Sequence, residues 1–163
     1  MPITYKQINP ELLDLIVTQY IDIDPRHAKN FENIVREHIH LEDGSYSVVA
    51  LHDGKPVGFI STYTKNLTPP LESKQDAYID IIEVATQSRH QGIARTLITM
   101  TETWAKENGF TQIRSWSSKD KSEAISMWYS LGFAMCPAEI WIEWCKEVVE
   151  GYYVAKTLRQ KNR

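Results

Sequence analysis

The chain has 163 residues and a formal net charge of −3, which is typical of a single soluble globular domain over residues 1–163. The slightly acidic balance gives no general reason to expect nucleic acid or an anionic membrane surface as a partner. No apolar run approaches the roughly 20 residues that span a bilayer, and the segment that begins Met1-Pro2-Ile3 lacks the features of a secretory signal. We therefore expect a cytoplasmic protein.

The first forty residues predict a strand followed by two helices. Apolar and polar residues alternate over residues 3–8, as in a strand. Asn9 is a helix cap, and Pro10 suits the first helical position because it needs no N–H partner there. A second helix is expected to begin near Asp24-Pro25 and to carry an apolar stripe as far as Ile39.

A hairpin and an exposed loop are expected next. Asp53-Gly54 is a strong turn signal between the predicted strands 45–51 and 56–63. Pro69 and Pro70 cannot extend a strand ladder, so residues 65–76 are expected to form an exposed loop.

The second half of the chain predicts alternating strands and helices. In order, we expect a central strand at 77–85, a helix at 91–108 ended by Gly109, a strand at 110–117, a helix at 121–131 stopped by Gly132, and a closing strand at 151–158. The Trp-rich residues 139–150 fit a strand or a short helix equally well.

Cysteines and histidines give no sign of a metal site. Cys136 and Cys145 are too few and too oddly spaced for a zinc site or a disulfide framework. His38 and His40 are close in sequence, but residues i and i+2 point to different sides of a helix. The sequence predicts no bound metal.

The segment from Ile81 to Arg95 carries the most chemical information. An apolar strand leads into a short polar loop and then to Gly92, which opens an amphipathic helix. The free N–H groups of a first helical turn and the helix dipole favour an anion such as a pyrophosphate. A β-carbon at Gly92 would hold a phosphate away from the backbone. Neither a P-loop nor a Gly-x-Gly-x-x-Gly dinucleotide loop is present.

Two motifs resemble those of one enzyme family. The spacing Arg-x-x-Gly-x-Ala over residues 89–94, with Val84 five residues before the arginine, resembles the acyl-CoA loop of the GNAT N-acetyltransferase superfamily. Residues 124–133 resemble that family's Ala-x-x-x-aromatic-x-x-Leu-Gly-Phe helix, and the expected order of elements is also similar. The resemblance implies an α/β (α+β) GNAT-like acyl-CoA N-acyltransferase fold, with a mixed central sheet of six to seven strands flanked by about four helices.

The resemblance also implies a reaction and a cofactor site. The reaction is acetyl transfer from acetyl-CoA, the co-substrate, to a primary amine of a small molecule or peptide by direct attack. In the family, the central strand bends at a bulge and parts from the next strand, and the cofactor's pantetheine arm pairs with the opened edge. The residues that this implies for cofactor binding are Ile82 and Val84 for pantetheine, the N–H groups of Gln91, Gly92, Ile93, Ala94 and Arg95 with the Arg89 side chain for pyrophosphate, Lys121 for a phosphate or carbonyl, and Trp128 beside the pantetheine.

The catalytic residues are less completely specified. Asp80 and Glu83 interrupt an apolar strand, and related enzymes often place a carboxylate at the position of Asp80. A carboxylate in a partly apolar cleft has a raised pKa, which suits a general base. Both acids also have an ordinary interpretation, as partners of an arginine or a backbone group. Trp128 stands where the family has the tyrosine that serves as general acid, so the neighbouring Tyr129 is the candidate acid here. One residue along a helix turns a side chain by about 100°, so Tyr129 could equally be an ordinary, partly buried tyrosine.

The amine acceptor is barely specified by the sequence. Acidic and aromatic side chains in the expected acceptor region would suit a cationic amine, or they could be ordinary surface and core residues; they are Glu32, Glu37, His38, Tyr63, Glu72, Trp141, Glu143 and Trp144. Residues 140–145 could pair with their copy in a homodimer. The alternatives are a CoA-binding sensor or partner module without turnover, and an unrelated α/β interaction domain.

Overall fold

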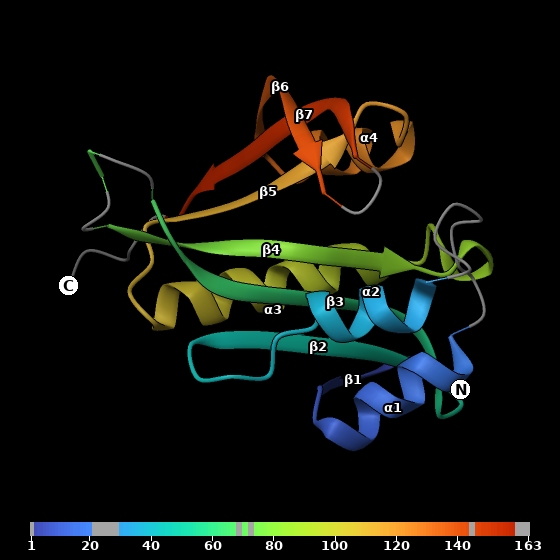
Figure 1. Ribbon diagram of the computed structural model, residues 1–163. Helices are drawn as coiled ribbons and strands as arrows, with labels where there is room; N and C mark the ends of the chain where they lie inside the picture. The colour runs from blue at the N-terminus through green and yellow to red at the C-terminus, as the bar shows by residue number, and fades with distance from the viewer. Residues whose placement is uncertain (1, 21–29, 68–69, 72–73, 144–145, 159–163) are drawn as a thin grey trace. The chain divides into compact units, whose positions relative to one another are not determined.

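The fold contains a mixed seven-stranded sheet and four α-helices within the described residues of a computed structural model, which are 2–20, 30–67, 70–71, 74–143 and 146–158 (Figure 1). The strands hydrogen bond in the order β1-β2-β3-β4-β5-β7-β6. Their bounds are β1 Thr4–Gln7, β2 Ser45–His52, β3 Lys55–Asn66, β4 Gln75–Val84, β5 Gln112–Ser118, β6 Ala134–Ile142 and β7 Glu147–Thr157. The helices are α1 Pro10–Gln19, α2 Phe31–His38, α3 Ile93–Glu107 and α4 Ser122–Ser130, with a short 3₁₀ helix, η2, at Thr86–Ser88.

The chain divides into two compact units. The first consists of Met1–Thr64 and Ile79–Trp104, and the second of Lys65–Tyr78 and Ala105–Arg163. Strands β3 and β4 therefore contribute residues to both units.

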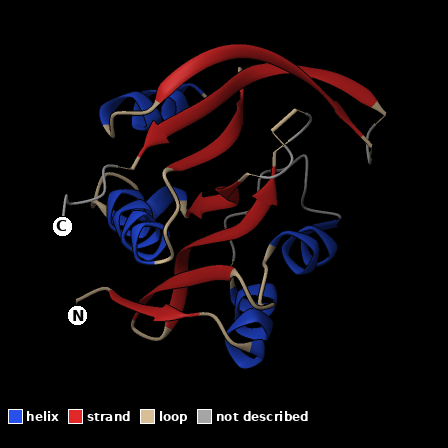
Figure 2. Cartoon of the chain, turned by 90° about the vertical axis from the view of Figure 1, so that its left-hand side faces the viewer, coloured by secondary structure: helices blue, strands red, loops and turns tan. Residues whose placement is uncertain are grey.

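The first unit is built on the antiparallel strands β1 to β3 and the second half of β4. Val49 of β2 lies opposite Lys6 of β1 and Phe59 of β3. Asp53 and Gly54 have φ angles of 51° and 78°, the two left-handed positions of a tight hairpin turn, so the predicted turn is confirmed. Helix α3 lies on one face of these strands, and α1 and α2 lie on the other (Figure 2).

The hydrophobic core of the first unit lies between its strands and the helices α1 and α2. Its buried members are Ile8, Ile16, Tyr20, Val35, Ile39, Val49, Leu51, Phe59 and Ala85. Ile93, Leu97 and Ile98 of α3 are also buried. Apolar residues at helical spacing thus fix the faces on which the three helices pack.

The second unit joins β5, β7 and β6 in an antiparallel arrangement, with the start of β4 parallel to β5. Trp128 of α4 is 2% exposed, and its ring lies 4.8 Å from that of Phe133. Gly132 ends α4 with a φ of 85°, as the sequence predicted.

Several predicted boundaries differ from the structure by a few residues. β3 continues to Asn66 and β4 begins at Gln75, so the loop predicted at 65–76 is shorter at both ends. The ambiguous residues 139–150 include the end of β6 and the start of β7. β6 also contains Pro137, which a strand at the edge of a sheet tolerates because one side of its backbone needs no partner. The predicted start of the second helix, at Asp24-Pro25, lies outside the described residues.

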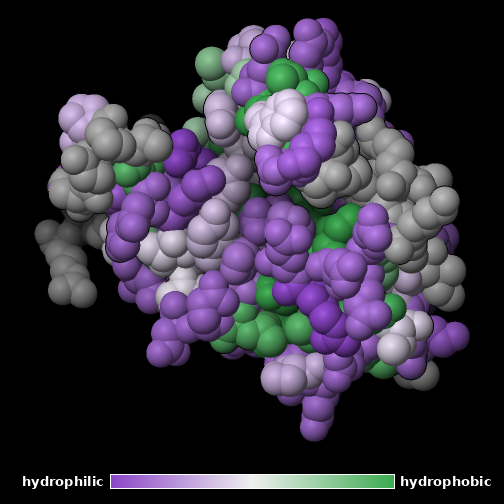
Figure 3. Space-filling model, in the orientation of Figure 1, coloured by the Kyte–Doolittle hydropathy of each residue, from purple (hydrophilic) through white to green (hydrophobic). Residues whose placement is uncertain are grey.

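Within the described ranges, none of the helices combines the length and apolar character that crossing a bilayer requires. On the face shown in Figure 3, hydrophobic residues form separate patches among hydrophilic ones.

Replacing the cap of α1 is expected to destabilise the first unit. The Asn9 side chain accepts a hydrogen bond of 2.8 Å from the Leu12 N–H, which would otherwise lack a helical partner. We expect Asn9→Ala to lower the free energy of unfolding by about 1 kcal/mol in urea denaturation. Asn9→Asp keeps the acceptor and should match the wild type, and equal losses in both variants would contradict the capping role.

Candidate functional site

The loop between β4 and α3 is held in place at its base by backbone contacts. The Ala85 N–H donates to the Val57 carbonyl over 2.9 Å, and the Ser88 N–H donates to the Ala85 carbonyl over 2.8 Å. Gly58 allows this close approach, because a β-carbon there would lie 3.0 Å from the Glu83 carbonyl oxygen and 3.1 Å from a methyl group of Ile93. Gly58 was not among the predicted site residues, although a glycine inside a strand often marks such an approach.

The loop ends in a backbone conformation that suits an anion. His90 and Gly92 have φ angles of 60° and 80°, with Gln91 between them. When left-handed and right-handed residues alternate, their backbone N–H groups point toward one spot, as in the concave sites that bind phosphates. The Thr96 N–H makes the first helical bond, to the Gly92 carbonyl over 2.9 Å, so the N–H groups of residues 93–95 precede the internal ladder of α3.

Gly92 faces open space. A β-carbon built on it would meet no atom within 4 Å. The exposed loop can therefore admit a ligand close to the backbone at this point. These features fit the predicted pyrophosphate site.

The other predicted cofactor residues of the first unit lie on or next to this loop. Ile82 and Val84 are half-buried on β4, Arg89, Gln91 and Arg95 are exposed, Ala94 is half-buried, and Ile93 is buried. The Arg89 Nε donates to the Val84 carbonyl over 3.1 Å. A ligand that pairs with Val84 would use its N–H or take the place of Arg89.

The other predicted cofactor and catalytic residues, Lys121, Trp128 and Tyr129, belong to the second unit. Lys121 is half-buried at the cap of α4, where its carbonyl accepts from the Ile125 N–H. Trp128 is buried against Phe133, whereas Tyr129 is 74% exposed. Consecutive residues of a helix point about 100° apart, which explains why Trp128 is buried and Tyr129 is exposed.

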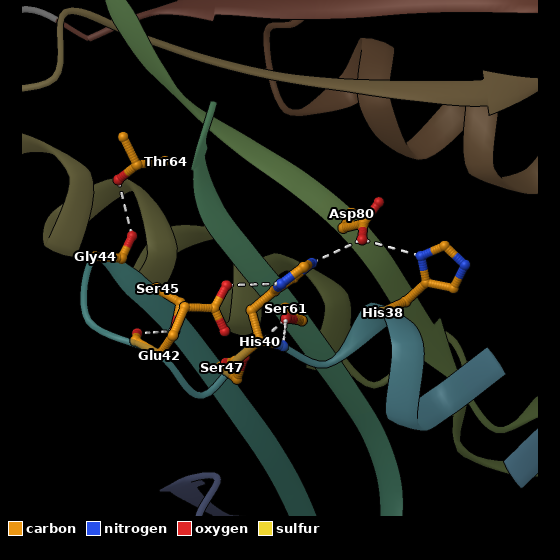
Figure 4. Close-up of polar contacts among 9 residues, drawn as sticks. All are labelled: His38, His40, Glu42, Gly44, Ser45, Ser47, Ser61, Thr64 and Asp80. Carbon is orange, nitrogen blue, oxygen red and sulfur yellow. Dashed lines mark hydrogen bonds and ion pairs between the residues drawn. The ribbon is translucent and has the colours of Figure 1, made fainter. Parts of the chain in front are cut away.

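Asp80 lies at the centre of a polar cluster that the sequence analysis did not assemble (Figure 4). Its Oδ2 atom is 2.9 Å from His38 Nδ1 and 2.8 Å from His40 Nε2. The three side chains are only 20%, 35% and 19% exposed, respectively. Glu83, the other predicted acid, is half-buried three residues further along β4.

His40 is fixed from several sides. Its Nδ1 lies 3.0 Å from Glu42 Oε1, and its ring centroid is 4.4 Å from that of Tyr63. Its backbone N–H donates to the Ser61 hydroxyl, and its carbonyl accepts from the Ser47 hydroxyl. The cluster therefore rests on a buried polar network between β2 and β3.

His38 and His40 do not lie on different sides of a helix, as predicted, because α2 ends at His38. His38 is the last residue of α2, and Ile39 has extended angles of φ −95° and ψ 109°. In extended chain, residues i and i+2 point to the same side. Both imidazoles consequently reach Asp80.

The expected direction of the pKa shift at Asp80 was also wrong. Burial raises the pKa of Asp80, but hydrogen bonds from His38 and His40 and the charges of those rings outweigh burial, so the pKa lies below its ordinary value. The hydrogen bond from Asp80 raises the pKa of His38 above its ordinary value, against the opposing effect of burial. A carboxylate with this lowered pKa is a weak general base.

The two shifts give stability a pH dependence. The Asp80 contribution is present above its unfolded pKa of 3.8 and is lost as pH falls through the lower folded value. The His38 contribution is present below its unfolded pKa of 6.5 and is lost as pH rises through the higher folded value. We expect His38→Gln to reduce stability more at pH 5.5 than at pH 8.5, as measured by urea unfolding. An equal loss at both pH values would contradict the charge pairing.

The predicted acceptor residues divide between the two units. In the first unit, Glu32 pairs with Arg36, Glu37 is exposed, and Tyr63 packs on His40. In the second unit, Trp141 Nε1 donates to Glu143 Oε2 over 2.6 Å, and Glu143 also pairs with Lys146. Glu72 and Trp144 lie outside the described residues. Nothing in the described part of the chain groups three or more His, Cys, Asp or Glu residues in a way that could hold a metal ion.

Comparison with known proteins decides the family. The family described as Acetyltransferase (GNAT) family matches residues 9–133. The chain belongs to the GNAT acetyltransferase family. It is therefore an acyltransferase, and both motifs singled out in the sequence lie within the matched region. No curated protein matches this GNAT chain in sequence.

Solved structures share the GNAT fold at low sequence identity. Arabidopsis thaliana NAA60, in complex with a bisubstrate analogue, has a TM-score of 0.75 and 15% identity, with 98% of this chain and 100% of that chain covered. The Escherichia coli ribosomal-protein-S18-alanine N-acetyltransferase has a TM-score of 0.69 and 16% identity, with coverage of 99% and 97%. The aminoglycoside N-acetyltransferase AAC(6')-Iy, in complex with CoA, has a TM-score of 0.65 and 20% identity, with coverage of 86% and 98%. The predicted fold is thereby confirmed.

Proposed function

We propose that this GNAT chain transfers the acetyl group of acetyl-CoA to a primary amine of a small molecule or peptide by direct attack. The observation that carries the proposal is the loop at the start of α3, where left-handed His90 and Gly92 precede the free N–H groups of a helix N-terminus. A pyrophosphate is the ligand that such a loop favours.

The cofactor supplies an activated thioester, and the chain's own residues hold it. The N–H groups of residues 91–95 would bind the pyrophosphate, with the Arg89 and Arg95 side chains nearby. The described pairing of β4 with β5 ends at Tyr78, before Ile82 and Val84. The backbone of these two residues would then pair with the pantetheine arm. Lys121 and Trp128 stay as further predicted cofactor residues on α4.

The class of amine is the open part of the proposal. One structural neighbour is named for the alanine of a ribosomal protein, and another for aminoglycosides. Both kinds of acceptor present a primary amine. At identities of 16% and 20%, neither substrate can be assigned to this chain without an activity measurement. A cytoplasmic location and a homodimer likewise stay predictions.

Thiol release from acetyl-CoA in the presence of defined amines tests the proposal. The panel is spermidine, kanamycin and a hexapeptide that begins with alanine, each compared with the same hexapeptide acetylated at its N-terminus. We expect at least one free amine to raise thiol release above the blocked peptide, with an acetylated product confirmed by mass spectrometry. Thiol release that no amine stimulates would contradict the transferase proposal.

Trp128 favours a second candidate, a CoA-binding module without turnover. In similar proteins this position carries a tyrosine that acts as the general acid. Here it is the buried Trp128, and the neighbouring Tyr129 is exposed. In that case acetyl-CoA would bind tightly, and no amine would release the thiol. The same panel therefore separates the two candidates.

A further inference from the structure

We propose that His38 removes the proton from the acceptor amine and that Asp80 is the positioning residue that holds His38. This role rests on the proposed N-acetyltransferase function and assigns its general base. It replaces the expectation that Asp80 itself takes the proton.

Asp80 is poorly suited to be the base because two imidazoles already stabilise its charged form. A single atom, Oδ2, faces both His38 Nδ1 and His40 Nε2 at 2.9 and 2.8 Å. A carboxylate oxygen that accepts two such hydrogen bonds is stabilised in its charged form and binds a further proton weakly. Its remaining task is to orient the groups that donate to it.

His38 is the histidine with a nitrogen left for a substrate. Both ring nitrogens of His40 face carboxylates, Nε2 at Asp80 and Nδ1 at Glu42. The Nε2 atom of His38 has no hydrogen-bond partner among the described residues, and the side chain is 35% exposed. If Nδ1–H donates to Asp80, the neutral ring carries its lone pair on Nε2. We assign this tautomer from the hydrogen-bond pattern.

The position along β4 also suits this role. A pantetheine arm that begins at the loop and runs back along Val84 and Ile82 would carry its thioester in the direction of Asp80. Asp80 stands two residues before Ile82, about 7 Å along a strand. His38 reaches Asp80 from the end of α2 (Figure 4). The free nitrogen of His38 would therefore lie near that end of the arm.

The proton balance of the reaction is complete with groups already named. His38 Nε2 takes one proton from the ammonium group, and the resulting imidazolium is stabilised by Asp80. The free amine nitrogen attacks the thioester carbon, so a C–N bond forms and the C–S bond breaks. The extra proton on the new amide nitrogen goes to the departing thiolate, and His38 later returns its proton to water.

The decisive experiment is the pH dependence of kcat between pH 5 and 9 with the panel amine that is turned over fastest. Among the described residues, the charged groups that act on His38 are Asp80 of β4 and Glu37, the neighbour of His38 on α2. His40 and Glu42 act through Asp80. We expect the wild type to lose activity at acidic pH as His38 is protonated. His38→Gln should lower kcat by about 10²–10⁴-fold and remove that acidic limb.

Two controls separate this role from a structural one. His52→Gln changes another histidine beside an aspartate, at the end of β2, and should leave both kcat and the acidic limb unchanged. The Kd of acetyl-CoA, measured by calorimetry, should be the same in His38→Gln and the wild type.

Asp80→Asn provides a readout that does not depend on turnover. The amide keeps the shape of Asp80 and removes its charge, so the pKa of His38, followed by NMR of its imidazole, should fall toward or below 6.5. The acidic limb of kcat should move to lower pH by the same amount.

Two results would overturn the assignment, and they are distinguishable. Wild-type kcat with an unchanged acidic limb in His38→Gln would remove His38 from the mechanism while the proposed function stands. A wild-type protein that binds no acetyl-CoA would overturn the proposed function, and the role of His38 with it.

Discussion

Gly92→Glu is expected to weaken the binding of acetyl-CoA strongly while leaving the protein folded. Gly92 has a φ of 80°, and a β-carbon there meets no protein atom within 4 Å, so the added side chain occupies only the space in front of the loop. The carboxylate would lie where the pyrophosphate is proposed to bind. Lost N–H contacts and charge repulsion together should weaken the Kd by roughly 100-fold or more in calorimetric titration.

Gly54→Glu is the matched control for this substitution. Gly54 also has a left-handed φ, 78°, and open space around its β-carbon, but it lies in the β2–β3 turn. Both variants carry the same backbone strain, about 1–2 kcal/mol for a residue with a side chain. Equal affinity for acetyl-CoA in the two variants would show that the loop at Gly92 does not hold the cofactor.

Asp76→Ala is expected to be the most destabilising of these substitutions. Asp76 is fully buried in the second unit, where Oδ2 accepts from Arg114 and from the Gln112 amide over 3.1 Å. Removal of one partner leaves the Arg114 charge, only 28% exposed, without its carboxylate. We expect a loss of about 3 kcal/mol, or a fall in Tm of roughly 6–12 °C.

The exposed ion pair of the same unit provides the comparison. Glu150 pairs with Lys119 over 3.0 Å, and both side chains are more than 60% exposed. Glu150→Ala should change the Tm little, because water screens exposed pairs. Similar falls in Tm for Asp76→Ala and Glu150→Ala in calorimetric scans would contradict the importance of burial.

The fold could be predicted wherever local chemistry decides it. Asn9 caps α1, and Asp53-Gly54 forms the hairpin turn, because each feature depends on a few neighbouring residues. Strand boundaries were less accurate, since they depend on pairing with distant strands. Pro137 inside β6 is an example, because only the edge position of that strand makes the proline acceptable.

The candidate site divides in the same way. The anion loop could be predicted because one strand, one glycine and one helix start are adjacent in sequence. The Asp80 cluster could not, because its contacts join residues 42 and 40 positions apart. They also depend on α2 ending at His38, which no nearby glycine or proline signals. The direction of the pKa shift of Asp80 was predicted wrongly for the same reason. The strand pattern shows that Asp80 is partly buried, but it does not show that two imidazoles contact the carboxylate.

Binding of acetyl-CoA to the wild-type protein tests the central claim most directly. Calorimetric titration with acetyl-CoA, and with CoA in parallel, should show saturable one-to-one binding with a Kd in roughly the micromolar range, about −8 kcal/mol. Absence of heat and of any cofactor-dependent rise in Tm would contradict the claim that the loop at the start of α3 holds acetyl-CoA.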